Sequence, residues 1–158
     1  MYVFSGWNKI MEKTIFAIVT ESPERTELLG GLFSKYLENG TFVAMYGDLG
    51  AGKTAFVRGI VGKMIPEAYV TSPTYTIVNE YHGNGYKICH FDMYRIGNAD
   101  DLESIGFFDY LRDGICIAEW CENIKDELPE ERFEVYFEKL SENERRITLT
   151  KIWEEEEE

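Results

Sequence analysis

Long apolar runs and cysteine are both scarce in this sequence of 158 residues. No segment approaches the roughly 20 apolar residues that a membrane-spanning helix needs, so we expect no membrane span. The three cysteines (Cys89, Cys116 and Cys121) form neither a CxxC pair nor an even set, which disfavours a disulfide framework. Two of them lie in apolar runs, where a thiol usually acts as a small hydrophobic side chain. We therefore predict a reducing, cytoplasmic location.

Positive charge is also scarce, because 16 Lys and Arg residues face 29 Asp and Glu residues and leave a net charge of −13. Such a surface repels polyanions, so we expect no autonomous binding to DNA, RNA or anionic membranes. Part of the excess lies in the acidic tail, residues 153–158, which we interpret as a solvated end; a docking tail for a basic partner is the alternative. Any recognition of phosphate must come from a local site.

Apolar periodicity predicts strands and helices that alternate along the chain. Ser22 and Pro23 are typical of a helix start, and Glu24 falls in the first turn. With no internal repeat or linker, this order predicts an α/β three-layer sandwich with a mixed, mainly parallel central sheet. The expected strands are residues 14–21, 41–46, two strands within 75–94 around a turn at 82–85, 114–120, and a final hairpin within 132–152 that turns at 141–144. The expected helices are residues 23–37 and 53–64, and residues 100–112 are expected to be helical or partly helical.

Glycine is concentrated in one short stretch, "GDLGAGKT" at residues 47–54. It matches G-x-x-x-x-G-K-[ST] at every specified position, after a predicted strand and before a predicted helix. Successive amides must curl around phosphate oxygens there, and side chains at Gly50 or Gly52 would obstruct them. Lys53 would neutralise the β- and γ-phosphates, and the Thr54 hydroxyl is suited to Mg²⁺. The pattern predicts binding of a nucleoside triphosphate.

Two carboxylates follow buried runs at predicted strand ends: Asp92 in "YKICHFD" and Glu119 in "GICIAEW". A carboxylate in such a place is costly unless it meets a cation, hydrogen bonds or water. Together with the phosphate loop, the pair predicts one metal ligand and one group that orients water. The pattern alone leaves open which acid has which role.

Several other residues are weaker candidates. The hydroxyl-rich "TSPTYT" (residues 71–76) lies where a switch segment could meet the γ-phosphate, although an ordinary turn explains it equally well. His90 is more typical of a hydrogen-bonded structural residue. Arg58 and Arg95 could stabilise phosphate charge, but nothing in the sequence singles out either one for that role. The guanine-reading N-K-x-D signature of GTPases is absent, which weakens a guanine interpretation without proving adenine.

Four blocks occur in the order "YGDLGAGKTAFVRGI", "TSPTYTIVNEY", "HFDMYRI" and "AEW". Together they closely resemble the TsaE (formerly YjeE) family over roughly residues 14–150. The resemblance implies a P-loop NTPase fold and an ATPase of bacterial tRNA threonylcarbamoyladenosine (position 37) biosynthesis. It also implies the partners TsaB and TsaD, tRNA reached only through that complex, and hydrolysis of ATP to ADP that supports turnover of the TsaB–TsaD heterodimer.

The resemblance also implies a set of site residues. Mg²⁺ would be held by Thr54 and Glu119, while Lys53, Asp92 and Thr74 would serve catalysis, with Asp92 a candidate to organise the attacking water. The nucleotide would be bound by Glu24, Asp48, Leu49, Gly50, Ala51, Gly52, Lys53, Thr54, Ala55 and Trp120.

Two other hypotheses remain open from the sequence: a small-molecule kinase, and a nucleotide-gated interaction module whose hydrolysis is incidental. We divide the chain into an N-terminal extension (residues 1–13), a single P-loop ATPase domain (residues 14–152) and the acidic tail (residues 153–158). Without an assured arginine finger in the chain itself, we expect slow hydrolysis in the absence of partners.

Overall fold

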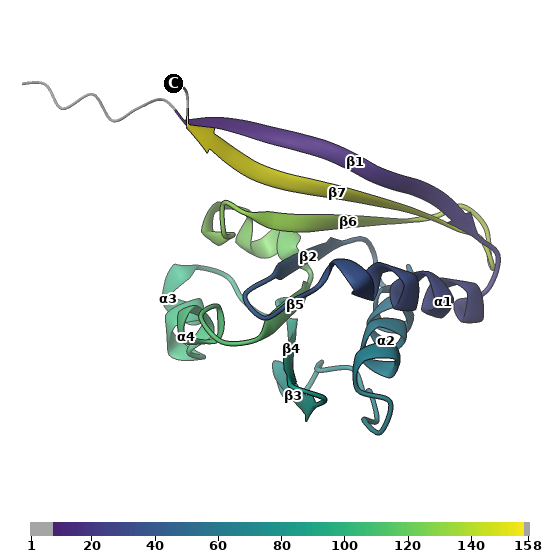
Figure 1. Cartoon of the computed structure of the whole chain (residues 1–158), viewed down its shortest axis with the longest axis horizontal. Coiled ribbons are helices and arrows are strands. Elements are labelled where there is room, and N and C mark those ends of the chain that lie inside the picture. The colour runs from purple at the N-terminus through teal and green to yellow at the C-terminus, as the bar shows by residue number, and fades with distance from the viewer. Residues whose placement is uncertain (1–7, 157–158) are drawn as a thin grey trace, which may run out of the picture.

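The structure, a computed structural model, describes residues 8–156, in which strands and helices alternate along much of the chain (Figure 1). The strands are β1 (Asn8–Thr20), β2 (Phe42–Tyr46), β3 (Val78–Gly83), β4 (Tyr86–Asp92), β5 (Ile115–Glu119), β6 (Arg132–Lys139) and β7 (Arg145–Glu156). The helices are α1 (Pro23–Phe33), α2 (Lys53–Met64), α3 (Ala99–Ser104) and α4 (Phe107–Tyr110), with 3₁₀ segments η1 (Ser34–Tyr36) and η2 (Cys121–Glu127).

The strands form one seven-stranded sheet in the order β1-β7-β6-β2-β5-β4-β3. Its four central strands, β6, β2, β5 and β4, pair in parallel. The outer pairs, β1–β7, β7–β6 and β3–β4, are antiparallel. The predicted mixed sheet with a parallel centre is therefore confirmed.

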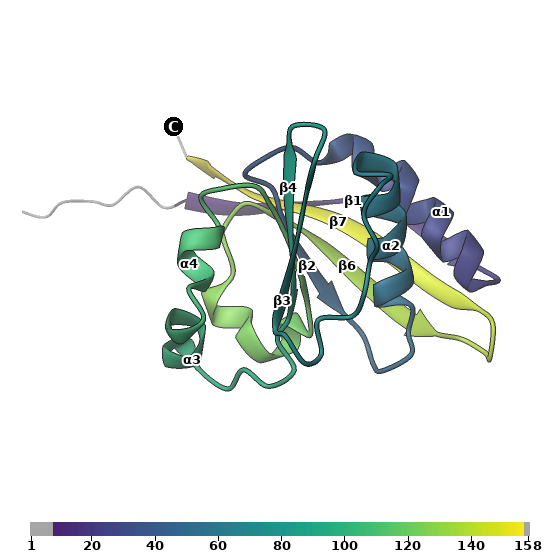
Figure 2. The ribbon, with the colours of Figure 1, turned by 90° about the horizontal axis from the view of Figure 1, so that it is seen from below.

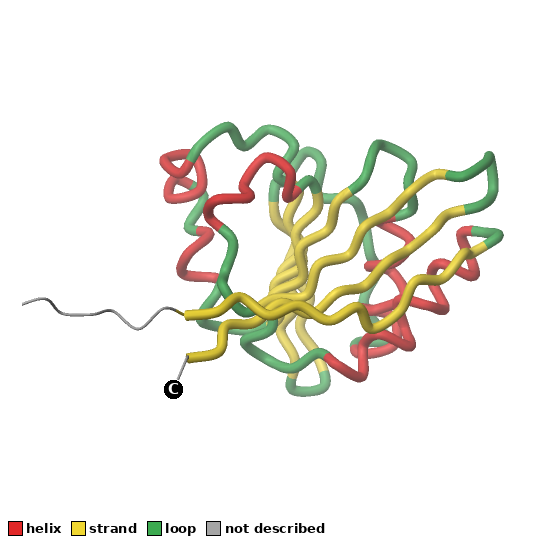
Figure 3. The backbone as a smooth tube through the Cα atoms, turned by 90° about the horizontal axis from the view of Figure 1, so that it is seen from above, coloured by secondary structure: helices red, strands yellow, loops and turns green. Residues whose placement is uncertain are grey.

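The sheet is covered on both faces, as the views in Figures 2 and 3 show. Helices α1 and α2 lie on one face, and one buried apolar cluster joins them to β2, β5, β6 and β7. Helices α3 and α4 lie on the other face, over a second cluster built largely from β2, β4 and β5. Because parallel strands are buried on both faces, β2 and β5 consist entirely of buried residues.

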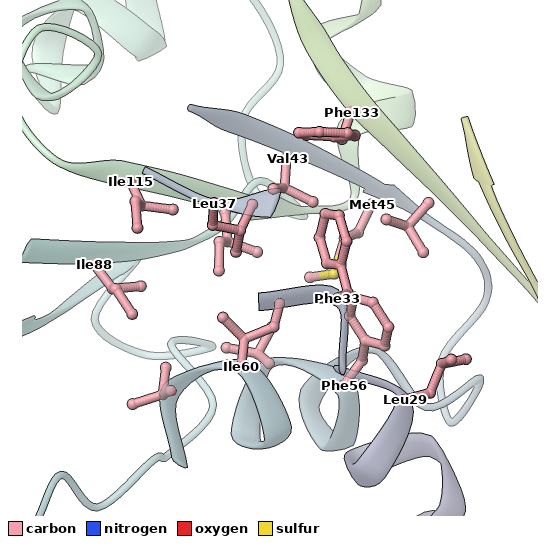
Figure 4. Close-up of a cluster of buried hydrophobic side chains, with 14 of the residues drawn as sticks. Leu29, Phe33, Leu37, Val43, Met45, Phe56, Ile60, Ile88, Ile115 and Phe133 are labelled. Atoms are coloured by element: carbon pink, nitrogen blue, oxygen red, sulfur yellow. The ribbon is translucent and has the colours of Figure 1, made fainter. Parts of the chain in front are cut away.

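Aromatic rings fix α1 and α2 to the sheet (Figure 4). Phe33 of α1 stacks on Phe56 of α2 with ring centroids 5.7 Å apart, and it meets Phe133 of β6 edge-on at 5.2 Å. Such offset and edge-to-face pairs add stability beyond the apolar area that they bury. Phe33, Phe56 and Phe133 thereby hold α2, and the loop before it, in one position over the sheet.

The two helices approach so closely that glycine is required where they touch. A Cβ atom on Gly59 would lie 1.8 Å from the carbonyl oxygen of Glu27, and one on Gly30 would lie 2.1 Å from that of Phe56. Any larger residue would push the helices apart, because the clashing atoms belong to the backbone.

Strand direction determines where the loops gather. Strand β1 is antiparallel to β7, and β7 is antiparallel to β6, so β1 runs in the same direction as the central strands. The carboxyl ends of β1, β6, β2, β5 and β4 therefore meet at one edge of the sheet. In open α/β sheets this edge is where ligands bind.

Several predicted bounds differ from the structure. Strand β1 begins six residues before the predicted start, and β7 continues to Glu156, within the predicted acidic tail. The predicted helix at residues 100–112 is divided into α3 and α4, because Gly106 between them adopts φ 74°. Both predicted hairpins are confirmed. The division of the chain into domains stays a prediction, and residues 1–7 and 157–158 lie outside the described part.

The structure contains no helix, within residues 8–156, that is long and apolar enough to cross a membrane.

Candidate functional site

A cavity of about 580 Å³ lies at the edge of the sheet where the carboxyl ends of the parallel strands meet. Its volume falls within the range of about 300–1,000 Å³ that is usual for small-molecule sites. It is lined by Ser22, Pro23, Thr26, Leu49, Gly50, Ala51, Gly52, Lys53, Thr54, Ala55, Arg58, Ser72, Thr74, Asp92, Tyr94, Glu119, Trp120, Glu142, Asn143 and Arg145.

Residues 49–54 of the glycine-rich loop (residues 47–54) form one wall of this cavity. Gly47, Gly50 and Gly52 have φ values of 143°, 77° and 101°, which L side chains rarely adopt. A Cβ atom on Gly47 would also lie 2.7 Å from the carbonyl oxygen of Phe137. Helix α2 then begins at Lys53, so its amino-terminal amides and positive dipole end face the site. This is the geometry that the sequence pattern predicts for an anion cradle.

Lys53 is a buried cation within this cradle, with 5% of its surface exposed. Its ammonium donates a hydrogen bond to the Gly47 carbonyl and lies 3.7 Å from the ring centroid of Trp120. Burial lowers the pKa of Lys53, while the nearby carboxylates, chiefly Glu119 and Glu122, act in the opposite direction. A bound phosphate group beside this ammonium would stabilise its charged form, which burial disfavours.

Asp92 and Glu119 occupy equivalent positions at the ends of the neighbouring parallel strands β4 and β5, where they are register partners. Both are buried and both line the cavity. The Asp92 carboxylate accepts a hydrogen bond from the Tyr94 amide at 2.9 Å. The Glu119 carboxylate lies 2.5 Å from Nε2 of His90, which is itself fully buried. One acid is therefore held by the backbone and the other by a side chain.

The hydroxyl-rich segment (residues 71–76) also reaches the cavity, through Ser72 and Thr74. Their hydroxyls lie 2.7 Å apart and both residues are exposed. The next residue after the segment, Ile77, has φ 69°, a strained conformation for a β-branched side chain. Its carbonyl accepts a hydrogen bond from the Asp92 amide at 2.8 Å. The segment is thus connected directly to one of the two acids.

Most of the predicted site residues line the same cavity: Leu49, Gly50, Ala51, Gly52, Lys53, Thr54, Ala55, Thr74, Asp92, Glu119 and Trp120. Two do not. Asp48 is exposed on the loop without lining the cavity, and Glu24 lies in a separate hollow beside β1, α1 and α2.

Two residues that contact the loop were not predicted as site residues. Glu122 accepts a hydrogen bond from the Gly47 amide at 3.0 Å, and Arg145 donates to the Gly50 carbonyl. Each belongs to a segment far away in the chain, and neither lies in a pattern that marks it. Only the proximity of Glu122 to the "AEW" block could have suggested it.

Comparison with known proteins agrees with this geometry. The family model described as "Threonylcarbamoyl adenosine biosynthesis protein TsaE" matches residues 20–147. The chain belongs to the TsaE family. It is 34% identical over 134 residues to the tRNA threonylcarbamoyladenosine biosynthesis protein TsaE of Bacillus subtilis (strain 168), which covers 84% of each chain. It is 43% identical over 100 residues to that of Haemophilus influenzae, which covers 63% of each chain. The fold of this chain is similar to the crystal structure of Bacillus subtilis YdiB, with a TM-score of 0.71, 28% identity, and coverage of 93% of this chain and 88% of that one.

The oxygen donors that line this cavity are suited to a nucleotide bound with Mg²⁺. The Thr54 hydroxyl and the Glu119 carboxylate, both hard oxygen donors, line one cavity with the phosphate loop. Among residues 8–156 there is no cluster of three or more His, Cys, Asp or Glu side chains that could hold a metal alone. Mg²⁺ is usually bound by one or two protein oxygens together with phosphate oxygens, and Thr54 and Glu119 could supply the protein oxygens.

Proposed function

We propose that this chain binds ATP with Mg²⁺ in the cavity and hydrolyses it to ADP, as the ATPase component of tRNA threonylcarbamoyladenosine biosynthesis. The observation that carries the proposal is the convergence of Lys53, Thr54, Asp92 and Glu119 on one cavity beside a glycine-rich loop. Membership of the TsaE family supplies the pathway.

Each residue has a distinct task in this proposal. The loop amides and Lys53 hold the triphosphate, and Thr54 and Glu119 hold Mg²⁺. When bound, Mg²⁺ neutralises the charge that develops on the phosphate oxygens. Asp92 or Thr74 orients the attacking water. Asp92 is suited to this task because its carboxylate is held by the Tyr94 amide and, among residues 8–156, forms no hydrogen bond to another side chain that would compete for water.

We further propose that the partners are TsaB and TsaD, in the cytoplasm, and that tRNA is reached only through their complex. The net charge of −13 disfavours a direct contact with tRNA. Large side chains at the cavity are unusually exposed, with Leu49 at 88% and Tyr94 at 62%. Contiguous exposed apolar patches mark interaction surfaces, and we propose that Leu49 and Tyr94 contribute to such a patch. A partner docked there could supply a missing cation and speed hydrolysis.

The test is release of inorganic phosphate from Mg-ATP by the purified chain, with and without purified TsaB–TsaD. We expect slow release alone, faster release with the complex, and none for Lys53→Ala. ADP formed in excess of phosphate would instead indicate transfer to an acceptor, as in a kinase. If the TsaB–TsaD complex leaves the rate of ATP hydrolysis unchanged while ATP still controls its binding to this chain, the nucleotide-gated module is favoured.

A further inference from the structure

One arginine joins two segments that are far apart in the sequence. Arg145, the first residue of β7, donates from Nε and Nη2 to the Gly50 carbonyl at 3.3 and 3.0 Å. Its Nη1 donates to the carbonyls of the turn between β6 and β7. Those acceptors are the carbonyls of Ser141, Glu142 and Glu144, at 2.9, 3.0 and 2.9 Å.

The position of Arg145 follows from the topology. Strand β6 runs parallel to β2, so the turn after β6 lies at the same edge of the sheet as the loop after β2. Arg145 is partly buried and lines the cavity together with Glu142 and Asn143 of that turn. A Cβ atom on Gly52 would lie 3.9 Å from Cγ of Arg145, so the aliphatic stem of the arginine passes close to the last loop glycine.

The Gly50 peptide needs such a contact. Gly50 is exposed, adopts φ 77°, and would meet no atom within 4 Å if it carried a Cβ, so packing does not restrain it. A glycine peptide that is free to rotate could turn its carbonyl oxygen toward bound phosphate, where two partial negative charges would repel. Two guanidinium donors hold that oxygen on Arg145 instead. Hydrogen bonds from a charged donor are the stronger kind, and the planar fork is suited to holding several acceptors at once.

We propose that Arg145 is a positioning residue for the phosphates of a nucleoside di- or triphosphate. It fixes the Gly50 peptide so that the neighbouring amides remain available, and it ties the turn at residues 141–144 to the phosphate loop. Binding of the nucleotide therefore orders the turn as well as the loop. This inference rests on the proposed nucleotide binding.

The test compares Arg145→Gln with Arg146→Gln. Arg146 is the adjacent residue, is exposed, pairs with Glu138 at 3.0 Å and does not line the cavity, so it is a matched control. Calorimetric titration with Mg-ATP and with ADP gives the dissociation constants. We expect Arg145→Gln to weaken binding of both by about tenfold or more, the scale of a lost hydrogen bond to a charged group, with Arg146→Gln unchanged. Arg145→Lys should restore little, because one ammonium cannot span both sets of carbonyls.

A second measurement separates positioning from general stability. In the wild-type chain, ADP should slow amide hydrogen exchange in a peptide covering residues 141–144, and Arg145→Gln should abolish this slowing. Equal affinities and equal protection in the Arg145→Gln and Arg146→Gln variants would overturn the inference while leaving the proposed function intact. If Arg145→Gln does not fold, Arg145→Lys decides by the same two criteria. A wild-type chain that binds neither nucleotide would overturn both proposals.

Discussion

The ammonium of Lys53 lies 3.7 Å from the ring centroid of Trp120, so the phosphate-loop cation rests on an indole face. The contact depends on an unusual backbone. Trp120 has φ 59°, a left-handed conformation directly after Glu119 that ends strand β5. This turn lets the Trp120 side chain line the cavity. The ring is therefore placed where a change at Lys53 alters its surroundings.

Nucleotide binding should change the fluorescence of Trp120, because Lys53 must exchange part of its contact with the ring for contact with phosphate. We expect most of the ADP-induced change in emission to disappear in Trp120→Phe. Trp153→Phe is the control, since Trp153 lies on β7 outside the cavity. An undiminished response in Trp120→Phe would show that the signal arises elsewhere.

Substitutions at the neighbouring acids Asp92 and Glu119 should affect catalysis and metal binding separately. Asp92→Asn should keep the affinity for Mg-ATP but lower hydrolysis by about 10²–10⁴, the usual contribution of a positioned general base. Glu119→Gln should instead raise the Mg²⁺ concentration needed for tight ATP binding. Titrations of ATP affinity against Mg²⁺, together with single-turnover rates, distinguish the two. The reverse pattern would exchange the assigned roles.

The contact between α1 and α2 predicts opposite effects at two glycines of α2. Gly59→Ala would place a Cβ 1.8 Å from the Glu27 carbonyl oxygen, so the helices must separate. We expect a loss of about 3 kcal/mol, near the upper end of the usual cost of overpacking. Gly62→Ala meets no atom within 4 Å and should gain up to about 1 kcal/mol from helix propensity. Chemical denaturation measures both, and a stable Gly59→Ala variant would contradict the packing argument.

The phosphate loop and the two acids could be predicted because their signals are local. A buried strand, a glycine-rich turn and a helix follow each other directly, and Asp92 and Glu119 each end an apolar run. Arg145 and Glu122 could not be predicted, because their contacts with the loop join residues 95 and 75 positions apart and depend on the strand order.

The early start of β1 could not be predicted from the sequence either. Most of its residues are exposed, so its first half is held by pairing with β7 rather than by burial, and it shows no amphipathic pattern. The apolar periodicity of the first helix also indicated only part of its buried face correctly. Leu29 and Phe33 are buried, whereas Leu28 and Leu32, which follow the same helical spacing of apolar residues, are 60% and 69% exposed.

His90 provides the last prediction, because it is fully buried and bonded to Glu119 through Nε2. Among residues 8–156 its Nδ1 has no hydrogen-bond partner, so Glu119 is the side chain that fixes the ring. If Glu119 holds Mg²⁺ as proposed, His90 orients a metal ligand, and loss of such a partner typically weakens metal affinity 10–100-fold.

We therefore expect His90→Phe, which fills the same space without the hydrogen bond, to need at least about tenfold more Mg²⁺ for tight ATP binding. ATP binding without Mg²⁺ should be unchanged, and His90→Gln, which keeps a donor, should recover part of the loss. Melting temperatures of the two variants show whether the core remains intact. If His90→Phe has the wild-type Mg²⁺ dependence, the histidine is a structural core residue and Glu119 keeps its orientation without it.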